Sequence, residues 1–491
     1  MFRRILVWKA AVMALAVLCF ASCGLRSPEF NVLLISVDTL RADRLNSYGY
    51  DQHTVSPNID RLAQDGILFE NQIASSPWTT PSHMSMLTSL SPSTHGIVRP
   101  FGTAAKDLRP GMYNRLPEAR VTLAETLQAR GYATAAFTGG ITIDPTIGFD
   151  QGFSVYETSM YKLNEQNVST LFDWLGAHAT VPFFLFWHTF EVHAPYLHAK
   201  HLPEPFWKIR SEYDELAKSA SGEASLYAAH VSKNKKLRAF LVERGAFKRD
   251  VTEALYLGGI DSMDVWLGRL VAELRKRDLY DRTMIILTSD HGDEFADHDP
   301  ARFYDHHGHS AYEELVRVPL IIKLPDQRYA GTRVSTVTRA IDIMPTVLDL
   351  LGVEPAQNEM QGESLRPLWV DPSTVPERVA LTEASFSKDE IKSIRTSKFK
   401  YIIQIPATLA EKHGRSHIPD ELYRRLLFNL DEDPDEKENL LQPARRASAS
   451  DEAKRLDKLL RSMVTMQLGD VDQVQLDPDT IKRLKSLGYI Q

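Results

Sequence analysis

The order of apolar and polar segments predicts buried strands that alternate with amphipathic helices along most of the chain. Continuous apolar runs, typical of strands buried on both faces, cover 31–37, 133–137, 183–187, 283–289 and 318–323. Apolar residues at helical spacing predict helices at 57–65, 81–90, 122–130, 251–276 and 340–351. This alternation indicates an α/β fold, with one sheet sandwiched between layers of helices.

Three of these strands lead into a side chain that can bind a metal ion or move a proton. They are followed by Asp38, His188 and Asp290. Ligands of such sheets bind beyond the carboxyl ends of the strands. We therefore expect the three side chains to converge on one site.

A further helix begins close to the run 78–83, Trp-Thr-Thr-Pro-Ser-His. Pro81 suits the first turn, which makes Thr80 the expected N-cap and places Thr79 just outside the helix. A hydroxyl there faces unpaired backbone N–H groups, which bind phosphate or sulfate oxygens well. A helix cap without chemistry explains the same residues, but the converging strand ends favour a chemical role.

Two regions depart from the alternating pattern. Residues 197–250 are rich in Lys and Glu and contain no convincing strand, which predicts an inserted helical cap or, equally, a solvated surface excursion. From residue 376 the pattern changes to short strand-like segments, an acidic turn at 431–435 and a charged helical tail. We expect a main domain at 30–370 and a small C-terminal α+β subdomain with a helical tail at 371–491.

The first 22 residues predict an export signal. Arg3 and Arg4 precede an apolar stretch, and small residues lie directly before Cys23, which resembles a bacterial lipobox with a lipidated cysteine. We expect a lipoprotein-type signal peptide at 1–22 and a membrane-anchored protein of the periplasm or cell surface, with plain secretion and an uncleaved anchor as alternatives. Cys19 and Cys23 are the only cysteines, so the exported part has no thiol chemistry.

Composition limits the function classes. The chain has 491 residues, of which 43% are hydrophobic and 25% charged, as in ordinary globular proteins. Its net charge of -7 argues against a nucleic-acid partner. Carboxylates and imidazoles around a hydroxyl are what a metal-dependent ester-cleaving site needs, because the ion lowers the pKa of the hydroxyl and stabilises the charge of the transition state.

Taken in order, several motifs resemble the sulfatase family of the alkaline phosphatase superfamily. They are 37–43 (VDTLRAD), 57–62 (PNIDRL), 81–82 (PS), 193–196 (HAPY), 288–292 (TSDHG) and 312–320 (YEELVRVPL). The resemblance extends from Asn31 to Tyr489 and implies the alkaline-phosphatase fold.

The resemblance also implies roles for particular residues. A divalent ion (Ca²⁺, Mn²⁺, Zn²⁺ or Mg²⁺) would be held by Asp38, Thr79, Asp290 and His291, with Thr79 also the nucleophile. The other implied catalytic residues are His193 and His307, which would contact the oxygens of the ester. A second ion or the substrate would be contacted by Glu191 and His309.

Departures from the family pattern bear on the chemistry. Sulfatases carry Cys-x-Pro-Ser-Arg, whose cysteine becomes formylglycine, whereas this chain has threonine at 79 and histidine at 83. Thr39 stands where the family usually has a second aspartate, and His291 where arylsulfatases often have asparagine. Asp38, Thr79 and Asp290-His291 together are closer to the phosphodiesterase and phosphoethanolamine-transferase branches of the superfamily.

We therefore predict an exported metal-dependent hydrolase that cleaves phosphate monoesters or diesters, with transfer to an acceptor as a variant. Its substrate would be an anionic ester, such as one on a glycan or a lipid head group. A sulfatase with an unusual nucleophile is the first alternative. A non-catalytic lipoprotein that binds an anionic glycan is the second, and the joint presence of metal ligands and hydroxyl argues against it.

Overall fold

The computed structural model describes most of the chain outside its N-terminus and several loops. The described residues are 30–98, 112–194, 196, 198, 249–295, 297–298, 307–355, 360–385, 389–405, 423–443, 446–464, 472–475 and 478. The predicted signal at 1–22, Cys23 and nearly all of the predicted insertion at 197–250 lie outside these ranges. No helix within them combines the length and the apolar character needed to cross a membrane.

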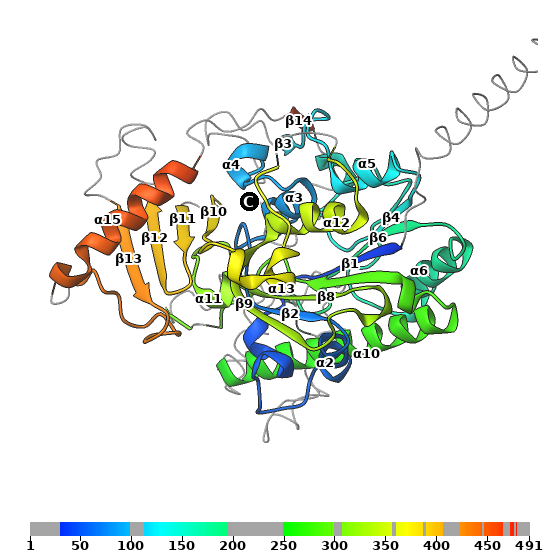
Figure 1. Cartoon of the computed structure of the whole chain (residues 1–491), viewed down its shortest axis with the longest axis horizontal. Helices are drawn as coiled ribbons and strands as arrows, with labels where there is room; N and C mark the ends of the chain where they lie inside the picture. The colour runs from blue at the N-terminus through cyan, green and yellow to red at the C-terminus, as the bar shows by residue number, and fades with distance from the viewer. Residues whose placement is uncertain are drawn as a thin grey trace, which may run out of the picture.

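An eight-stranded sheet forms the centre of the main body (Figure 1). In spatial order its strands are β5 (Val155–Glu157), β4 (Ala133–Phe137), β6 (Phe183–Thr189), β1 (Asn31–Val37), β7 (Thr283–Thr288), β8 (Arg317–Lys323), β2 (Ile67–Ile73) and β9 (Thr332–Arg339). β8 runs antiparallel to both of its neighbours. β1 lies in the middle, parallel to β6 on one side and to β7 on the other, so the carboxyl ends of these three strands meet.

Helices cover both faces of this sheet (Figure 1). One face packs against α2 (Pro57–Gln64), α6 (Glu165–Ala177) and α10 (Arg249–Lys276), and the other against α3 (Thr79–Thr88), α5 (Leu123–Gln128) and α12 (Ile343–Leu351). Side chains alternate along a strand, so Leu33 and Ile35 enter the first core and Val32 and Leu34 the second. Burial on both faces explains why β1 is a continuous apolar run.

A smaller antiparallel sheet is formed by β10 (Ala380–Ala384), β11 (Glu390–Arg395), β12 (Phe399–Ile405) and β13 (Arg424–Asn429). One of its faces packs on α15 (Arg446–Met463) and the other on residues next to β8. The chain then returns to the main body, where β14 (Asp472–Gln475) pairs with β3 (Met112–Arg115). The remaining short helices are α4 (Pro92–His95), α11 (Glu313–Val316) and α13 (Pro367–Val370), with 3₁₀ turns at Ala42–Arg44, Asn46–Tyr48, Pro145–Ile147, Tyr280–Arg282, Pro325–Gln327, Ala340–Asp342 and Pro372–Thr374.

The predicted α/β class is confirmed, but several elements differ from the prediction. β2 and β9 were not predicted, because β2 carries three polar residues at a bulge and β9 contains only two apolar residues. α3 begins at Thr79 with Trp78 as its N-cap, so the prediction of Thr80 as N-cap is wrong. The Thr80 hydroxyl instead donates to the carbonyl of Thr142, at 2.6 Å. The expected domain boundary after residue 370 stays a prediction.

Candidate active site

Asp38 and Asp290 lie in one place because they follow neighbouring strands. Asp38 directly follows β1, Asp290 follows β7, and Ser36 is in register with Thr288 across the two strands. On the other side of β1, Ser36 is in register with His188 of β6. The side chains of Asp38, His188 and Asp290 are fully buried. The three strand ends therefore meet, as their positions in the sequence predicted.

The Thr79 hydroxyl lies in the same place, at the first residue of α3. Thr79 Oγ1 donates to Oδ2 of Asp38 at 3.3 Å and lies 3.4 Å from Nε2 of His291. Trp78 gives the helix no side-chain cap, and the first backbone N–H groups of a helix have no partner within the helix. Ser82 donates to the carbonyl of Asp290 at 2.7 Å, which fixes the helix to the segment that follows β7.

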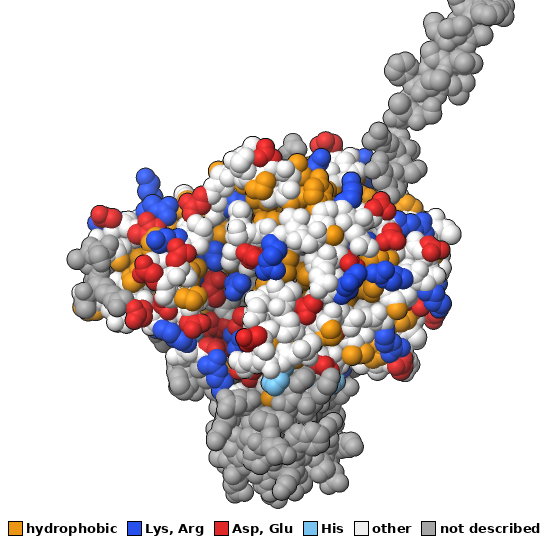
Figure 2. Space-filling view, turned by 60° about the horizontal axis from the view of Figure 1, so that its bottom comes forward, with side chains coloured by type: hydrophobic (Ala, Val, Ile, Leu, Met, Phe, Trp, Pro, Cys, Tyr) orange, Lys and Arg blue, Asp and Glu red, His pale blue; other side chains and the backbone are white. Residues whose placement is uncertain are grey.

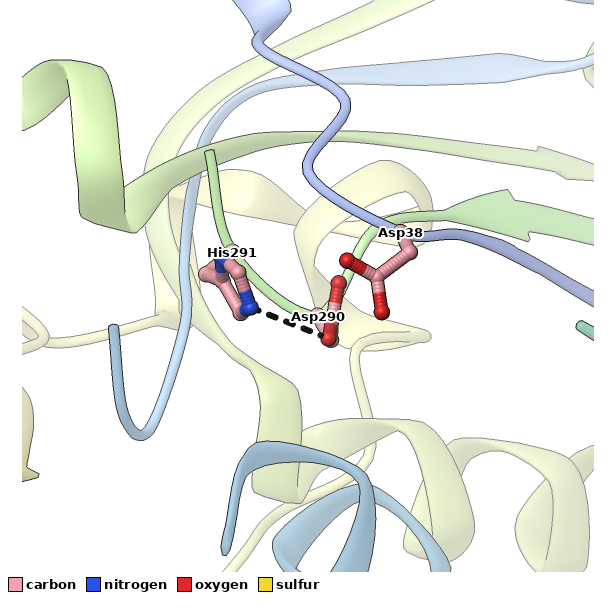
Figure 3. Close-up of side chains that lie close together, drawn as sticks. All are labelled: Asp38, Asp290 and His291. Carbon is pink, nitrogen blue, oxygen red and sulfur yellow. Dashed lines mark ion pairs between the residues drawn. The ribbon is translucent and has the colours of Figure 1, made fainter. Parts of the chain in front are cut away.

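The two carboxylates lie close together and lack enough donors. Figure 3 shows Asp38 and Asp290 facing one another, with the His291 ring beside Asp290. Oδ1 of Asp38 and Oδ2 of Asp290 are buried and accept no hydrogen bond, and one ligand atom from each of the three residues lies within 4.8 Å of the others. Burial and the charge of Asp290 raise the pKa of Asp38 well above its ordinary value. A cation bound between the two carboxylates would neutralise them.

The orientation of His291 supports the same conclusion. Its Nδ1 lies 2.8 Å from the carbonyl of Gly292. A carbonyl oxygen only accepts hydrogen bonds, so Nδ1 carries the proton. Its Nε2 therefore carries a lone pair, and this atom lies 3.4 Å from Oδ2 of Asp290. A lone pair facing a carboxylate oxygen is repulsive unless a cation lies between them. Ligating histidines hold their second nitrogen to a carbonyl in this manner. Asp38, Asp290, His291 and Thr79 thus fit a divalent ion, and this oxygen-rich set with one imidazole suits Ca²⁺, Mg²⁺, Mn²⁺ or Zn²⁺.

Two further buried histidines support these ligands. His188 accepts from the backbone N–H of Gly139 at 3.4 Å, so its Nε2–H can donate to Oδ2 of Asp38 at 3.3 Å. His83 donates from Nδ1 to the carbonyl of Thr79 at 3.0 Å and accepts from Ser36 Oγ at 2.8 Å. Burial lowers the pKa of both imidazoles, so they are neutral. His188 was expected at the converging strand ends, whereas His83 was not assigned to the site. The spacing of four residues between Thr79 and His83 nevertheless places both on one face of a helix.

His193 and His307 form a second layer beside the carboxylates. The ring centroids of His193 and His307 are 5.2 Å apart, and His307 lies 4.6 Å from His291. His193 donates from Nδ1 to the carbonyl of Ala194, and its buried Nε2 has no hydrogen-bond partner. Nδ1 of His307 lies 3.5 Å from Oδ1 of Asp293. Burial lowers the pKa of both histidines. A base or acid is thus available beside His291.

Glu191 and His309 are engaged elsewhere. Glu191 accepts from Ser262 Oγ at 2.6 Å and from the backbone N–H of Leu163 at 2.9 Å. His309 pairs through Nε2 with Oε2 of Glu294, at 2.7 Å. The structure does not bring these two residues to the Asp38 cluster, so it gives no support to their expected role as second-ion ligands there.

We predict that Asp38→Asn separates the effect of charge from the effect of the ion. In a chelator, the variant should melt above the wild type, because the repulsion between the two carboxylates is removed. With Mn²⁺ added, binding at this site should stabilise the wild type by about 2.7 kcal/mol at a concentration 100 times Kd, and the variant should gain less than the wild type by that contribution. Thermal melting with and without Mn²⁺ measures both effects.

The control is Asp264→Asn. Asp264 is a buried carboxylate that accepts from the backbone N–H of Asn58 and does not belong to the Asp38 cluster. It should keep the response to Mn²⁺. An equal Mn²⁺ response in the wild type and Asp38→Asn would contradict the assignment of the ligands.

Comparisons with known proteins agree with this geometry. Residues 30–353 match the family model described as Sulfatase, and residues 301–463 match the model described as N-sulphoglucosamine sulphohydrolase, C-terminal. The multifunctional alkaline phosphatase superfamily protein PehA of Trinickia caryophylli is 26% identical over 420 residues, which cover 70% of this chain and 77% of PehA.

Solved structures show the same fold. The phosphonate monoester hydrolase of Agrobacterium radiobacter superposes with a TM-score of 0.63 at 22% identity, covering 91% of this chain and 100% of the hydrolase. A protein solved in complex with its substrate D-glucosamine-2-N,6-O-disulfate superposes with a TM-score of 0.66 at 21% identity, covering 89% and 97%. Because the first family model spans well over half of the residues, this chain belongs to the sulfatase family of ester hydrolases.

Proposed function

We propose that this enzyme cleaves phosphate monoesters or diesters with Thr79 as the nucleophile, and that the phosphoryl group then passes to water or to an acceptor hydroxyl. The observation that carries the proposal is the position of Thr79 Oγ1, 3.3 Å from Asp38 Oδ2 and 3.4 Å from His291 Nε2 at the start of α3. A hydroxyl in this position can attack an ester whose oxygens face the N-terminus of the helix.

The nucleophile favours phosphorus over sulfur. A sulfated threonine has no second hydroxyl on the same carbon, so it cannot release sulfate by the elimination open to an aldehyde hydrate. A phosphothreonine can be resolved by attack of water at phosphorus. Cys19 and Cys23 are the only cysteines of the chain, so no cysteine is present near position 79 for conversion to formylglycine.

The residues around Thr79 supply the proton transfers. A bound divalent ion would lower the pKa of the hydroxyl and offset the negative charge of the phosphoryl group. Thr79 gives its proton to Oδ2 of Asp38, which it already contacts. Oγ1 then forms its bond to phosphorus while the bond from phosphorus to the leaving oxygen breaks.

His307 is the favoured proton donor to the leaving oxygen. Asp293 lies beside Nδ1 of His307 and stabilises the imidazolium, and an anionic ester next to the ring does the same. After this transfer the neutral His307 can take a proton from water, whose oxygen attacks phosphorus. The bond from phosphorus to Thr79 Oγ1 breaks, and Oδ2 of Asp38 returns its proton to Oγ1. His193 is the alternative donor, since its Nε2 has no hydrogen-bond partner.

The relatives support a phosphorus ester as the class of substrate, but they do not identify the substrate itself. PehA is named as multifunctional, and one of the similar structures is a phosphonate monoester hydrolase. Hydrolysis of a sulfate ester is the second candidate, favoured by the fold shared with a protein that binds a sulfated glucosamine. For either chemistry we propose an anionic ester on a glycan or a lipid head group.

We predict that Thr79→Ala lowers kcat/KM for 4-nitrophenyl phosphate or bis(4-nitrophenyl) phosphate by at least about a thousandfold, because the nucleophile is lost. Thr79→Ser should retain activity and yield a phosphoserine peptide on rapid acid quench, detected by mass spectrometry. The matched control is Thr80→Ala, because the hydroxyl of Thr80 contacts the carbonyl of Thr142. This variant should remain active. Faster turnover of 4-nitrophenyl sulfate than of the phosphate would contradict the proposal.

We predict that His307→Ala impairs esters with poor leaving groups most. An alkyl leaving group needs a proton, so its cleavage should slow about 10²–10⁴-fold. Nitrophenolate needs none, and its release should slow much less. Steady-state rates on alkyl and nitrophenyl phosphates test this in His307→Ala and His193→Ala. A leaving-group effect confined to His193→Ala would assign the proton to His193, and equal losses on both substrates would contradict the acid role of both residues.

We also propose that the enzyme is exported and anchored by lipid on Cys23. Metabolic labelling with a radioactive fatty acid should mark the wild type, because the cysteine after the small residues becomes the lipidated N-terminus. Cys23→Ser should lose the label and leave the membrane fraction, whereas Cys19→Ser should keep both. Labelling that survives Cys23→Ser would contradict this assignment.

A further inference from the structure

A second group of potential metal ligands lies where the small sheet meets the main body. His298 belongs to the segment after β7, Glu314 to α11, and Glu436 to the turn after β13. One ligand atom from each lies within 4.8 Å of the others. In the space-filling view, acidic side chains gather between the lobe of the small sheet and the main body (Figure 2).

The ligand atoms are buried and poorly satisfied. Nε2 of His298, Oε1 of Glu314 and Oε1 of Glu436 are inaccessible to solvent and make no hydrogen bond. Nε2 of His298 lies only 2.8 Å from Oε1 of Glu314, yet the two atoms do not align as donor and acceptor. Two side chains that bind the same ion are expected to lie close together without hydrogen-bonding to each other. The same signature, buried carboxylate oxygens without donors, marks the Asp38 cluster.

Neighbouring cations do not neutralise the group. Lys400 is fully buried and shared by two carboxylates, 3.0 Å from Glu313 and 3.2 Å from Oε1 of Glu436. Arg395 lies 3.6 Å from Glu313. Glu314 has no ion pair with a lysine or arginine in the described part of the chain, where it pairs with His298. The carboxylate of Glu314 is thus not paired with a lysine or arginine among the described residues, although Arg424, Arg425 and Lys437 line the neighbouring cavity. A divalent ion would compensate the charge of this carboxylate.

The ring of His298 is held in place, and there is room for further ligands. It stacks on Tyr312, with centroids 3.6 Å apart and planes within 13°. Its backbone N–H donates to Glu294 at 3.2 Å. A cavity of about 330 Å³ borders His298 and Glu436, with Arg424 also in its wall, and can admit an ion with its water ligands.

We propose that His298, Glu314 and Glu436 bind a second divalent ion, of the Mn²⁺ or Zn²⁺ type, that fastens the small sheet to the main body. One imidazole and two carboxylates are the donors that such ions accept. The ion would join three segments that are distant in sequence. It is separate from the Asp38 site and does not depend on the proposed reaction.

The second site is coupled to the first through backbone contact. The N–H of Gly292, next to His291, donates to the carbonyl of Leu315 at 2.8 Å. A Cβ atom at Gly292 would lie 1.9 Å from the carbonyl oxygen of Glu314, so only glycine permits this approach. An ion on Glu314 therefore fixes α11, against which the segment carrying His291 packs.

The test is a Mn²⁺ titration of the chelator-treated protein, with bound ion counted by electron paramagnetic resonance. It is made in Asp38→Asn, which removes the first site. This variant should bind one Mn²⁺ per chain, and adding Glu314→Gln or His298→Gln should abolish that binding together with the rise in melting temperature that Mn²⁺ causes. The wild type should bind two Mn²⁺ per chain, and Glu314→Gln alone should reduce this number to one.

The matched control is Glu432→Gln in the same acidic turn as Glu436, where Glu432 is exposed. It should leave the count of bound ions unchanged. Glu436→Gln is avoided because Glu436 also accepts the backbone N–H of Glu313. Absence of Mn²⁺ from Asp38→Asn, or binding that survives both Glu314→Gln and His298→Gln, would overturn the proposal. An ion-free protein with His298 and Glu314 as a simple ion pair would give the first of these results.

Discussion

The repulsion between two buried carboxylates is the constraint on which the site depends. Asp38 and Asp290 are fully excluded from water and lie beside each other at the ends of adjacent parallel strands. Burial makes each charge costly, and proximity adds to that cost. The fold holds them there because Ser36 and Thr288 are locked in register on two central strands. A bound cation would recover the free energy lost in this arrangement while both carboxylates stay ionised.

Neutral imidazoles complete the arrangement without adding fixed charge. Nδ1 of His188 accepts from the N–H of Gly139, so the proton of the neutral ring is on Nε2. This Nε2–H faces Asp38. His83 is fixed between α3 and β1 by its contacts to Thr79 and Ser36. The helix that carries Thr79 and the strand that precedes Asp38 are therefore joined by one side chain. A change in the position of α3 would move Thr79 and disturb Asp38 together.

Sequence alone predicted the buried centre of the sheet and the residues at its carboxyl ends, because strands covered on both faces are continuous apolar runs. The prediction failed for strands that are not continuous apolar runs. β9 reads TRVSTVTR, and its pairing with β2 is long-range. The Asp38, Thr79, Asp290 and His291 cluster could be predicted from motifs, but tautomers and unpaired oxygens could not. Glu436 carried no signal, since its meeting with His298 depends on how the small sheet packs on the body.

Two departures from the family pattern largely cancel in charge. Thr39 replaces a carboxylate, and its backbone N–H donates to Oδ1 of Asp290 at 3.3 Å while its hydroxyl donates to the carbonyl of Asp38. His83 replaces a guanidinium and is neutral, because burial lowers its pKa and both of its nitrogens are engaged. The site has lost one negative and one positive group, so its net charge does not select phosphate over sulfate. In the reaction proposed above, selection comes from the fate of the covalent intermediate, because water can resolve a phosphothreonine at position 79 whereas a sulfated threonine has no route for elimination.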